Sequence, residues 1–331
     1  MSMFFSILSV PPPQMSIKSN EEDGNQTEPI TFILLDFNNE DLQVLFSVLF
    51  LPIYLVTMAG NILIILLVVN NQHLHTPMYF FLGNLSCLET CYSSAIMPRM
   101  LVSFLTGDRT ISVHGCFAQL YFFGCLAGTE CYFLAVMSYD RYLAICKPLH
   151  YVMLMNGRIC IMLIVGSWVS GSLGISVLIY LVSQLRFCGP NKINHFFCDF
   201  TPMVRLSCNE TDLVEQTAFI VSSLATLPPL LITVSSYVSI IKSILRIPST
   251  IGKQKAFSTC SSHLTVVACF YGSLMIVYVL PNMSSLIDLK KLLSLLYTML
   301  TPLVNPLVYS LRNKEVKDAA KKTFKLFQRA H

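Results

Sequence analysis

Long runs of residues without a formal charge alternate with short polar segments along most of the chain. Uninterrupted runs cover residues 42–88, 159–185, 216–241, 256–287 and 292–311. Two further apolar stretches, 77–103 and 110–139, are interrupted inside by Glu89 and Glu130. Each run has the ~20 residues that a helix needs to cross the hydrocarbon of a bilayer. Because the runs are continuous and do not alternate between apolar and polar positions, they predict membrane-spanning helices and not a β-barrel.

A turn-prone segment divides the longest of these runs. Residues 70–77 read NNQHLHTP, and splitting the run there gives seven helices. We therefore predict an all-α membrane protein, a seven-transmembrane helix bundle. An extracellular tail over 1–41 precedes the bundle, and a short amphipathic helix with a cytoplasmic tail follows over 312–331. The predicted helices lie near 42–69, 77–103, 113–141, 158–180, 213–244, 255–280 and 289–311.

The composition agrees with a protein built for lipid. Only 12% of the 331 residues are charged, and 54% are hydrophobic. Globular chains usually carry ~25% charged residues. A soluble enzyme, a collagen-like fibre and a disordered chain are therefore excluded.

The distribution of basic residues predicts the orientation. With seven helices the two ends of the chain lie on opposite sides, and the side that holds the C-terminal tail has 14 of the 22 Lys and Arg residues, against 8 on the other. Cytoplasmic loops retain positive charge during insertion. We therefore expect a multi-pass plasma-membrane protein with an extracellular N-terminus, a cytoplasmic C-terminus and a glycosylation site at Asn25 in the sequence Asn-Gln-Thr.

Four of the twelve cysteines fall on the predicted extracellular side, where disulfides can form. Cys116 begins the third helix, and Cys188, Cys198 and Cys208 are spaced ten residues apart in the loop between the fourth and fifth helices. Four cysteines allow three pairings, and the spacing alone does not choose among them.

Two carboxyl groups lie near the middle of predicted helices, where an ionisable group is costly and indicates function. Glu89 and Glu130 reach a similar depth, so they are expected to interact. One of them could be protonated, or both could share a small cation and water. With Asn61 and Asn305 also available, we favour a pocket that holds Na⁺ or water over simple buried hydrogen bonding.

Four strings in order give the chain a specific resemblance. They are PMYFFL at 77–82, MSYDRYLAIC at 137–146, KAFSTCSSHL at 255–264 and PLVNPLVYSLRN at 302–313. From about residue 25 to 325 the chain resembles a vertebrate odorant receptor, a family of rhodopsin-like (class A) G-protein-coupled receptors. It departs from that family's pattern at Glu89, where Asp is usual, at Ser138, where Ala is usual, and at Asp36, where Gly is usual.

The resemblance implies pairings, a switch and a partner. It implies disulfides joining Cys116 to Cys198 and Cys188 to Cys208. It also implies that a heterotrimeric G protein of the stimulatory olfactory type binds the cytoplasmic side and raises cAMP. The residues that the resemblance places in the activation switch are Asp140, Arg141, Tyr142, Tyr237, His263, Asn305, Pro306 and Tyr309.

The resemblance further implies a ligand site in the outer half of the bundle. On the third helix, small residues share a face and leave space, and the expected lining has no charge above Glu130. We therefore expect a small, mostly apolar, uncharged volatile, with a hydrogen bond to Tyr278. The expected lining is Phe123, Gly124, Ala127, Gly128, Val221, Ser222, Ala225, Leu274, Met275, Tyr278, Leu295 and Thr298.

Residues 314–328 predict an amphipathic helix on the membrane surface, with Val316, Ala320, Phe324 and Phe327 toward lipid and lysines toward anionic headgroups. We expect this role and not nucleic-acid binding. A transporter would show an internal repeat and broken helices, a channel would show rings of polar residues, and an enzyme would need convergent catalytic groups. For an odorant receptor, the expected location is the cilia of olfactory sensory neurons. The closest alternative is a receptor of the same class that serves another tissue.

Overall fold

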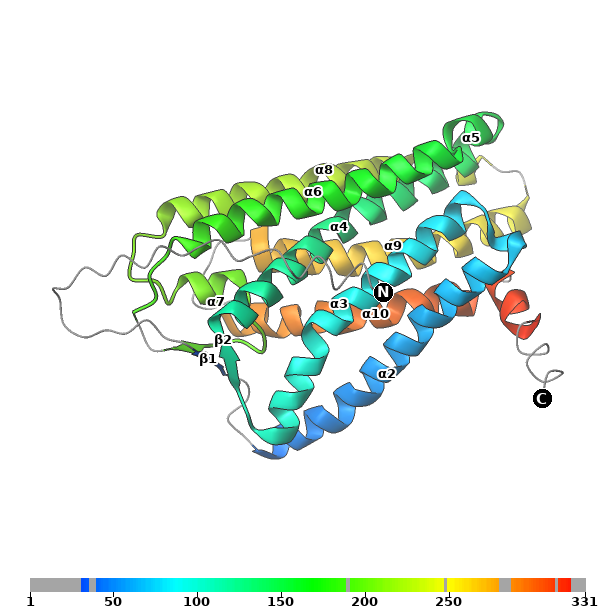
Figure 1. Cartoon of the computed structure of the whole chain (residues 1–331). Helices are drawn as coiled ribbons and strands as arrows, with labels where there is room; N and C mark the ends of the chain where they lie inside the picture. The colour runs from blue at the N-terminus through cyan, green and yellow to red at the C-terminus, as the bar shows by residue number, and fades with distance from the viewer. Residues whose placement is uncertain are drawn as a thin grey trace.

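Seven long helices form the body of the protein in a computed structural model that describes residues 31–35, 40–188, 191–246, 249–279, 287–312 and 315–322 (Figure 1). They run roughly along one direction, and the loops and short elements gather at the two ends of the bundle. The long helices are α2 (Glu40–Asn70), α3 (Pro77–Thr106), α4 (Val113–Cys146), α6 (Gly157–Ser183), α8 (Asp212–Leu245), α9 (Thr250–Leu274) and α10 (Ile287–Arg312).

The short elements complete the chain. They are β1 (Thr31–Leu34), η2 (Gln72–Leu74), β2 (Thr110–Ser112), α5 (Pro148–Leu154), β3 (Lys192–Ile193), α7 (Phe200–Val204) and η3 (Met275–Val279), a π-helical turn that continues α9. We call the end of the bundle that carries the strands and α7 the disulfide end, and the end that carries α5 the Arg141 end (Figure 1).

Four stretches of the described helices are long and apolar enough, by length and composition, to cross a bilayer: Leu45–Asn70, Val113–Cys146, Gly157–Ser183 and Asp212–Leu245. Shorter apolar helical stretches occupy His263–Val277 and Leu292–Leu307. In α3 the polar residues Asn84, Glu89 and Thr90 interrupt the apolar run. Many large apolar side chains on these helices are exposed. In a membrane they would contact lipid and not water, so the bundle is suited to a bilayer.

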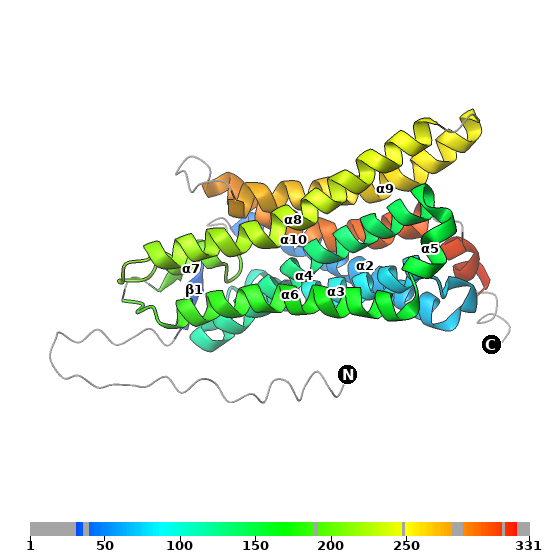
Figure 2. The same ribbon diagram turned by 90° about the horizontal axis from the view of Figure 1, so that it is seen from above.

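The helix α4 is the centre of the bundle. In an apolar 18-residue stretch of α4, 67% of the residues are buried, against 22–28% in comparable stretches of α2, α6 and α8. It packs against α3, α6 and α8, and in the view from above it lies between α6 and α8 (Figure 2). The chain folds around α4 because the other spanning helices each keep one broad face for lipid.

Local signals explain where helices begin and end. The side chains of Ser112 and Asn156 accept hydrogen bonds from backbone N–H groups in the first turns of α4 and α6, which is the usual way to cap a helix start. Helix α3 begins at Pro77 and ends at Thr106, and Gly107, which caps this end, has a φ of +71° that suits a residue without a Cβ.

The helices extend past the predicted bounds, most clearly in α4, which continues to Cys146 and not only to residue 141. A charged side chain ends the lipid-facing run but not the backbone hydrogen bonding. A 34-residue helix is ~51 Å long, more than the ~30 Å of hydrocarbon. The predicted ends near charged residues were therefore too early.

A small sheet at the disulfide end was not predicted. Strand β1 lies between β2, to which it is antiparallel, and β3, to which it is parallel. Phe32 and Leu34 of β1 are buried against a cluster that includes Cys116, Cys198 and Met203. Part of the segment that we assigned to a tail is thus packed over this end of the bundle.

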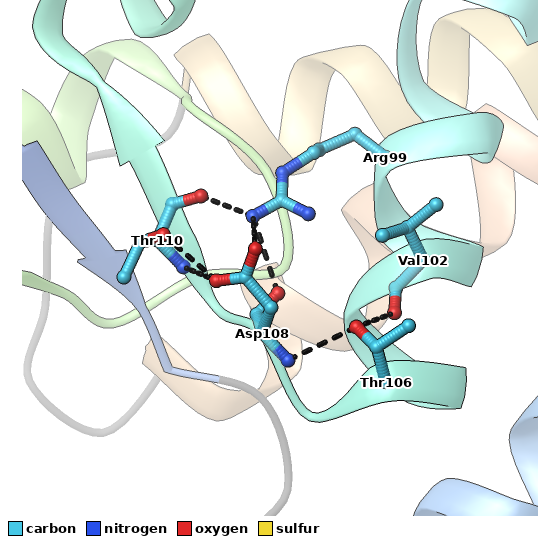
Figure 3. Close-up of polar contacts among 5 residues, drawn as sticks. All are labelled: Arg99, Val102, Thr106, Asp108 and Thr110. Atoms are coloured by element: carbon cyan, nitrogen blue, oxygen red, sulfur yellow. Dashed lines mark hydrogen bonds and ion pairs between the residues drawn. The ribbon is translucent and has the colours of Figure 1, made fainter.

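A polar network supports the turn that leads into this sheet (Figure 3). Asp108 Oδ1 accepts hydrogen bonds from the backbone N–H and the hydroxyl of Thr110, at 2.9 and 2.7 Å. Arg99 of α3 donates to the backbone carbonyls of Asp108 and Thr110 and lies 3.7 Å from the Asp108 carboxylate. These bonds to Thr110 lower the pKa of the exposed Asp108 carboxyl, and they fix β2 relative to α3.

The short helix over 315–322 packs on the protein differently from our expectation. Val316, which we placed toward lipid, is 2% exposed and packs in a cluster with Leu67, Leu74 and Tyr79. The hydroxyl of Tyr79 also donates a hydrogen bond of 2.7 Å to Glu315 Oε2. Because this face is occupied by α2 and α3, Val316 is not available to lipid. The predicted lipid-facing Phe324 and Phe327 lie outside the described residues, as do the N-terminal residues that include Asn25.

Candidate functional site

A cavity of about 800 Å³ lies between α4, α6 and α8, near the disulfide end. Its walls are largely apolar and include four glycines, Gly124 and Gly128 on α4 and Gly171 and Gly174 on α6. Ligand cavities for small molecules usually measure ~300–1,000 Å³ and are mostly apolar. The cavity is therefore the right size and chemistry for a small organic molecule.

The loop between α6 and α8 forms the roof of the cavity. Asp199, Phe200, Thr201 and Val204 line its upper part. The loop is tied to α4 by the Cys116–Cys198 disulfide. It is closed on itself by the Cys188–Cys208 disulfide. The two pairings that the resemblance implied are thus both formed.

Two further bonds hold this roof over the bundle. The backbone N–H of Cys198 donates to Gln119 Oε1 at 2.9 Å. The buried His195 ring lies 2.9 Å from the hydroxyl of Ser294 on α10, and 4.5 Å separates its centroid from that of Phe197. The loop is therefore anchored to both α4 and α10.

Most of the expected ligand-site residues line this cavity, and two described ones do not. Met275 lies in η3 but not on the cavity wall, and Thr298 donates its hydroxyl to the Ser294 carbonyl inside α10. The side chains of Tyr278 and Leu295 lie outside the described part of the chain. Those on the wall are Phe123, Gly124, Ala127, Gly128, Val221, Ser222, Ala225 and Leu274.

The expectation of an uncharged lining is wrong at the rim. Asp199 and Glu215 both border the cavity toward the disulfide end. Asp199 comes from a loop whose position depends on the Cys116–Cys198 disulfide, and Glu215 is in the first turn of α8. Neither residue was predicted to line the cavity, because the prediction considered only the middle of each helix.

The whole contribution of α6 was also missed. Seven of its residues line the cavity: Ser170, Gly171, Leu173, Gly174, Ile175, Val177 and Leu178. A signal was present in the sequence, since the stretch 166–176 reads GSWVSGSLGIS and small residues recur along it. Small residues in membrane helices mark close helix–helix contacts.

A polar cluster is buried deeper in the bundle. Glu89, Glu130, Asn61 and Asn305 are each at most 2% exposed. Asn305 Nδ2 donates to Glu89 Oε1, and the Glu130 carboxyl lies near that of Glu89. Asn61 Nδ2 donates at 3.1 Å to the Pro302 carbonyl of α10.

Several oxygens of this cluster have no hydrogen-bond partner within the described structure. They are Glu89 Oε2, both carboxyl oxygens of Glu130, Asn61 Oδ1 and Asn305 Oδ1. Buried polar atoms are nearly always hydrogen-bonded. A group of unpartnered acceptors is therefore suited to hold a cation or ordered water.

A charged cluster lies at the Arg141 end of α4. Asp140 is 1% exposed, and its Oδ2 accepts hydrogen bonds from the guanidinium of Arg141. Its other oxygen accepts a 2.8 Å hydrogen bond from the hydroxyl of Tyr151 on α5. Burial and the nearby Asp140 carboxylate raise the pKa of Tyr151, so the phenol stays a donor.

The remaining predicted switch residues lie around this end. Tyr237 of α8 and His263 of α9 are both buried, and 2.5 Å separates the hydroxyl from Nδ1. Tyr142 stacks on Tyr139, with ring centroids 6.1 Å apart. Pro306 lies within α10, which continues through it as a helix, and the side chain of Tyr309 is outside the described residues. Tyr151 was not predicted. It reaches Asp140 only because the chain turns after α4, so that α5 packs beside the end of that helix.

The arrangement of helices defines the class of protein. Squid rhodopsin matches with a TM-score of 0.71 and 17% identity over 88% of this chain and 82% of the rhodopsin chain. At that identity the likeness shows the fold, which is the seven-helix fold of rhodopsin.

Sequence comparison then identifies the family. The model of the olfactory receptor family matches residues 50–326. Human olfactory receptor 6N1 is 46% identical over 92% of this chain and 98% of its own, and human olfactory receptor 6F1 is 48% identical over 92% and 99%. The mouse olfactory receptor 5AP2 is 45% identical over 91% of this chain. The chain belongs to the olfactory receptor family of G-protein-coupled receptors, and it is a receptor and not an enzyme.

Proposed function

We propose that this receptor binds a small, mostly apolar, uncharged volatile in the cavity between α4, α6 and α8, and activates a stimulatory G protein of the olfactory type that raises cAMP. The observation that carries this proposal is the cavity itself, about 800 Å³ in volume. Its walls offer dispersion contacts and a few hydroxyls, such as those of Ser170 and Ser222. Its carboxylates are confined to the rim.

The Arg141 end is the proposed site of G-protein contact. Arg141 is 20% exposed in its side chain, while its partner Asp140 is buried. Breaking the contact between Arg141 and Asp140 would free the guanidinium to reach a partner, which fits a movement of helices at this end. We accordingly assign the disulfide end to the outside of the cell and the Arg141 end to the cytoplasm, with olfactory cilia as the location.

We further propose that the polar cluster around Glu89 and Glu130 holds Na⁺. The unpartnered oxygens of Glu89, Glu130, Asn61 and Asn305 fit such an ion, because hard cations prefer carboxylate and amide oxygens. A bound Na⁺ would neutralise charge that the low-dielectric interior disfavours. The test is the midpoint of thermal unfolding of purified receptor in NaCl or in N-methylglucamine chloride at equal ionic strength.

The sodium proposal predicts a specific pattern of stabilisation. Na⁺ should stabilise the wild type, since a ligand that binds only the folded state raises its stability, and this effect should be lost in Glu130→Gln. The control is Glu215→Gln, which removes a carboxylate at the cavity rim. An equal effect of Na⁺ on wild type and Glu130→Gln would refute a site at this cluster.

The test of signalling is a cAMP assay in cells that express the receptor with an olfactory-type stimulatory G protein. A broad panel of neutral volatiles is screened against wild type and Arg141→Ala, with surface expression measured in parallel. We expect a dose-dependent response that Arg141→Ala loses at matched expression. Full signalling by that variant would remove Arg141 from the coupling site, and silence of the wild type across the panel would count against the proposed ligand class.

A further inference from the structure

The cavity reaches the surface of the bundle on a side where lipid, and not water, is the neighbour. Four of its wall residues are large, apolar and strongly exposed: Leu173 (67%) and Val177 (44%) on α6, and Phe219 (54%) and Leu224 (61%) on α8. A residue that lines a cavity and is also exposed stands at an opening. These four residues define what we call the α6–α8 seam.

The depth of the seam places it within the hydrocarbon. Leu173 is 3 residues from the middle of α6 (Gly157–Ser183), and Leu224 is between 4 and 5 residues from the middle of α8 (Asp212–Leu245). At 1.5 Å per residue these are offsets of roughly 5–7 Å. The hydrocarbon extends ~15 Å to each side of its centre, so the seam opens to acyl chains.

The geometry of the helices explains the opening. Helix α4 packs against both α6 and α8 and lies between them in Figure 2. Gly124 and Gly128 of α4 line the cavity and let α6 approach closely, since a Cβ on them would lie 2.5 Å from Ile175 Cδ1 and 3.2 Å from Gly171 Cα. At the seam itself Gly174 faces Val221, since a Cβ on this glycine would lie 3.0 Å from a Val221 methyl carbon. Helices α6 and α8 thus both pack on α4 and touch each other at Gly174, and the exposed cavity-lining residues Leu173, Val177, Phe219 and Leu224 lie on the same two helices.

The direct path from the disulfide end is obstructed by contrast. The roof carries buried side chains at Phe197, Met203 and Val204, and it is fixed by the Cys116–Cys198 disulfide. Strand β1 covers this end further, with Phe32 fully buried. A ligand from the aqueous side would have to displace packed apolar groups or pass the rim beside Asp199 and Glu215.

We propose that the ligand reaches the cavity from the bilayer, through the α6–α8 seam. This inference rests on the proposed function in that it takes the cavity as the ligand site. Each methylene group favours transfer out of water by roughly fourfold, so a volatile with six methylenes is enriched in the bilayer by about 10³-fold or more. The membrane is then the reservoir from which the receptor takes its ligand. Partitioning into the bilayer favours apolar molecules before any of them binds the receptor.

The test follows the arrival of a probe that needs no signalling. Full-length receptor in phosphatidylcholine nanodiscs is mixed rapidly with an eight-carbon aliphatic diazirine and photolysed after variable delays. The label in the α4 segment 123–131, which faces the cavity, is measured by mass spectrometry. Leu173→Trp with Leu224→Trp should lower the rate constant of labelling, fitted to each variant's own final extent, at least threefold, because a narrowed passage slows the arrival of the probe.

Matched variants separate this route from the alternatives. The control pair is Val169→Trp with Leu231→Trp, on the same helices, at positions that are 59% and 69% exposed and do not line the cavity. Glu215→Trp narrows the aqueous rim. Should the seam pair lower the final extent of labelling, Val177→Trp with Phe219→Trp gives a second pair at the same opening.

The outcomes divide cleanly. Slowing by the seam pair alone supports the bilayer route. Labelling as fast in both seam pairs as in the control pair overturns it, as does slowing by Glu215→Trp that equals or exceeds that of the seam pairs. Since the readout is a covalent label, the route can hold even where no volatile raises cAMP, and a failed cAMP screen then counts against the proposed ligand class alone.

Discussion

Gly171 of α6 packs directly against the backbone of α4, and replacing it with alanine tests how the central helix is packed. A Cβ at this position would lie 2.4 Å from Thr129 Oγ1, 2.5 Å from Thr129 N and 2.8 Å from the Cys125 carbonyl oxygen. Real Cβ contacts are rarely shorter than 3.4 Å. Two of the three atoms belong to the backbone of α4, so no side-chain rotation can relieve the clash, and the helices must separate by several tenths of an ångström or more.

The expected loss of stability follows from this separation. Forcing extra volume into a packed interior usually costs about 1–3 kcal/mol. For a chain of this size each kcal/mol lowers the midpoint of thermal unfolding by ~2–4 °C, so the midpoint of Gly171→Ala should fall by roughly 2–12 °C. Gly166→Ala, on the same helix, is the control, because a Cβ at Gly166 would meet no atom within 4 Å. Alanine has the higher helix propensity, so this variant should not lose stability.

The assay follows the exposure of buried thiols. Cys125, Cys131 and Cys160 are free and buried, and a thiol-reactive dye reports their exposure when purified receptor in nanodiscs is heated. The reasoning would be refuted by a Gly171→Ala midpoint equal to that of Gly166→Ala. That result would mean that α4 and α6 are not in contact at this glycine.

Three other expectations follow from the structure. Tyr151→Phe removes a hydrogen bond to the buried Asp140 carboxylate, and such bonds contribute ~1.5–3 kcal/mol, so basal cAMP at matched surface expression should rise about tenfold or more; an unchanged basal level would mean that this bond does not hold the resting state. The lowered pKa of Asp108 means that its bonds to Thr110 stabilise the turn above its ordinary pKa of 3.8 and are lost as the pH falls through the lower folded-state value; hydrogen exchange of the Thr110 amide should therefore accelerate in acid, beyond the intrinsic rate, in wild type but not in Asp108→Asn. Joint replacement of Cys188 and Cys208 by serine opens a loop with a sequence separation of 20 and should lower stability by about 3 kcal/mol, and no change in the unfolding midpoint would contradict that expectation.

The helices could be predicted because each spanning run is encoded locally by its own lack of charge. The sheet could not, since its strands are only 2–4 residues long and their partners lie far apart, at Thr31–Leu34, Thr110–Ser112 and Lys192–Ile193. Such pairing carries no periodic signal of its own. It depends on the Cys116–Cys198 disulfide and on the turn at Asp108, which hold together segments that lie far apart in the sequence.

The cavity was accessible to sequence reasoning on α4 and α8 but not on α6. Small residues at Gly124 and Gly128 share one helix face, and this spacing can be read from the chain. The glycines of α6 show the same kind of pattern, but whether they face α4, α8 or lipid depends on how the helices pair. The rim carboxylate of Asp199 depends in turn on the Cys116–Cys198 link, so its place in the wall requires the assembled structure.

Three sites lie on the central helix α4, so their order and spacing could be predicted from the sequence without knowing which residues of other helices they contact. Helix α4 carries the cavity wall at Phe123 to Cys131, the deep carboxyl of Glu130 and the charged pair of Asp140 and Arg141. Sequence spacing alone fixes their separation, because a continuous helix rises 1.5 Å per residue. The groups beside them come from α6, α3 and α5, which the spacing does not reveal. A ligand that shifts α4 against α6 therefore moves the cavity wall and the Asp140 contact on one element, and Gly171, which packs against the α4 backbone, is a position where such a shift would be resisted.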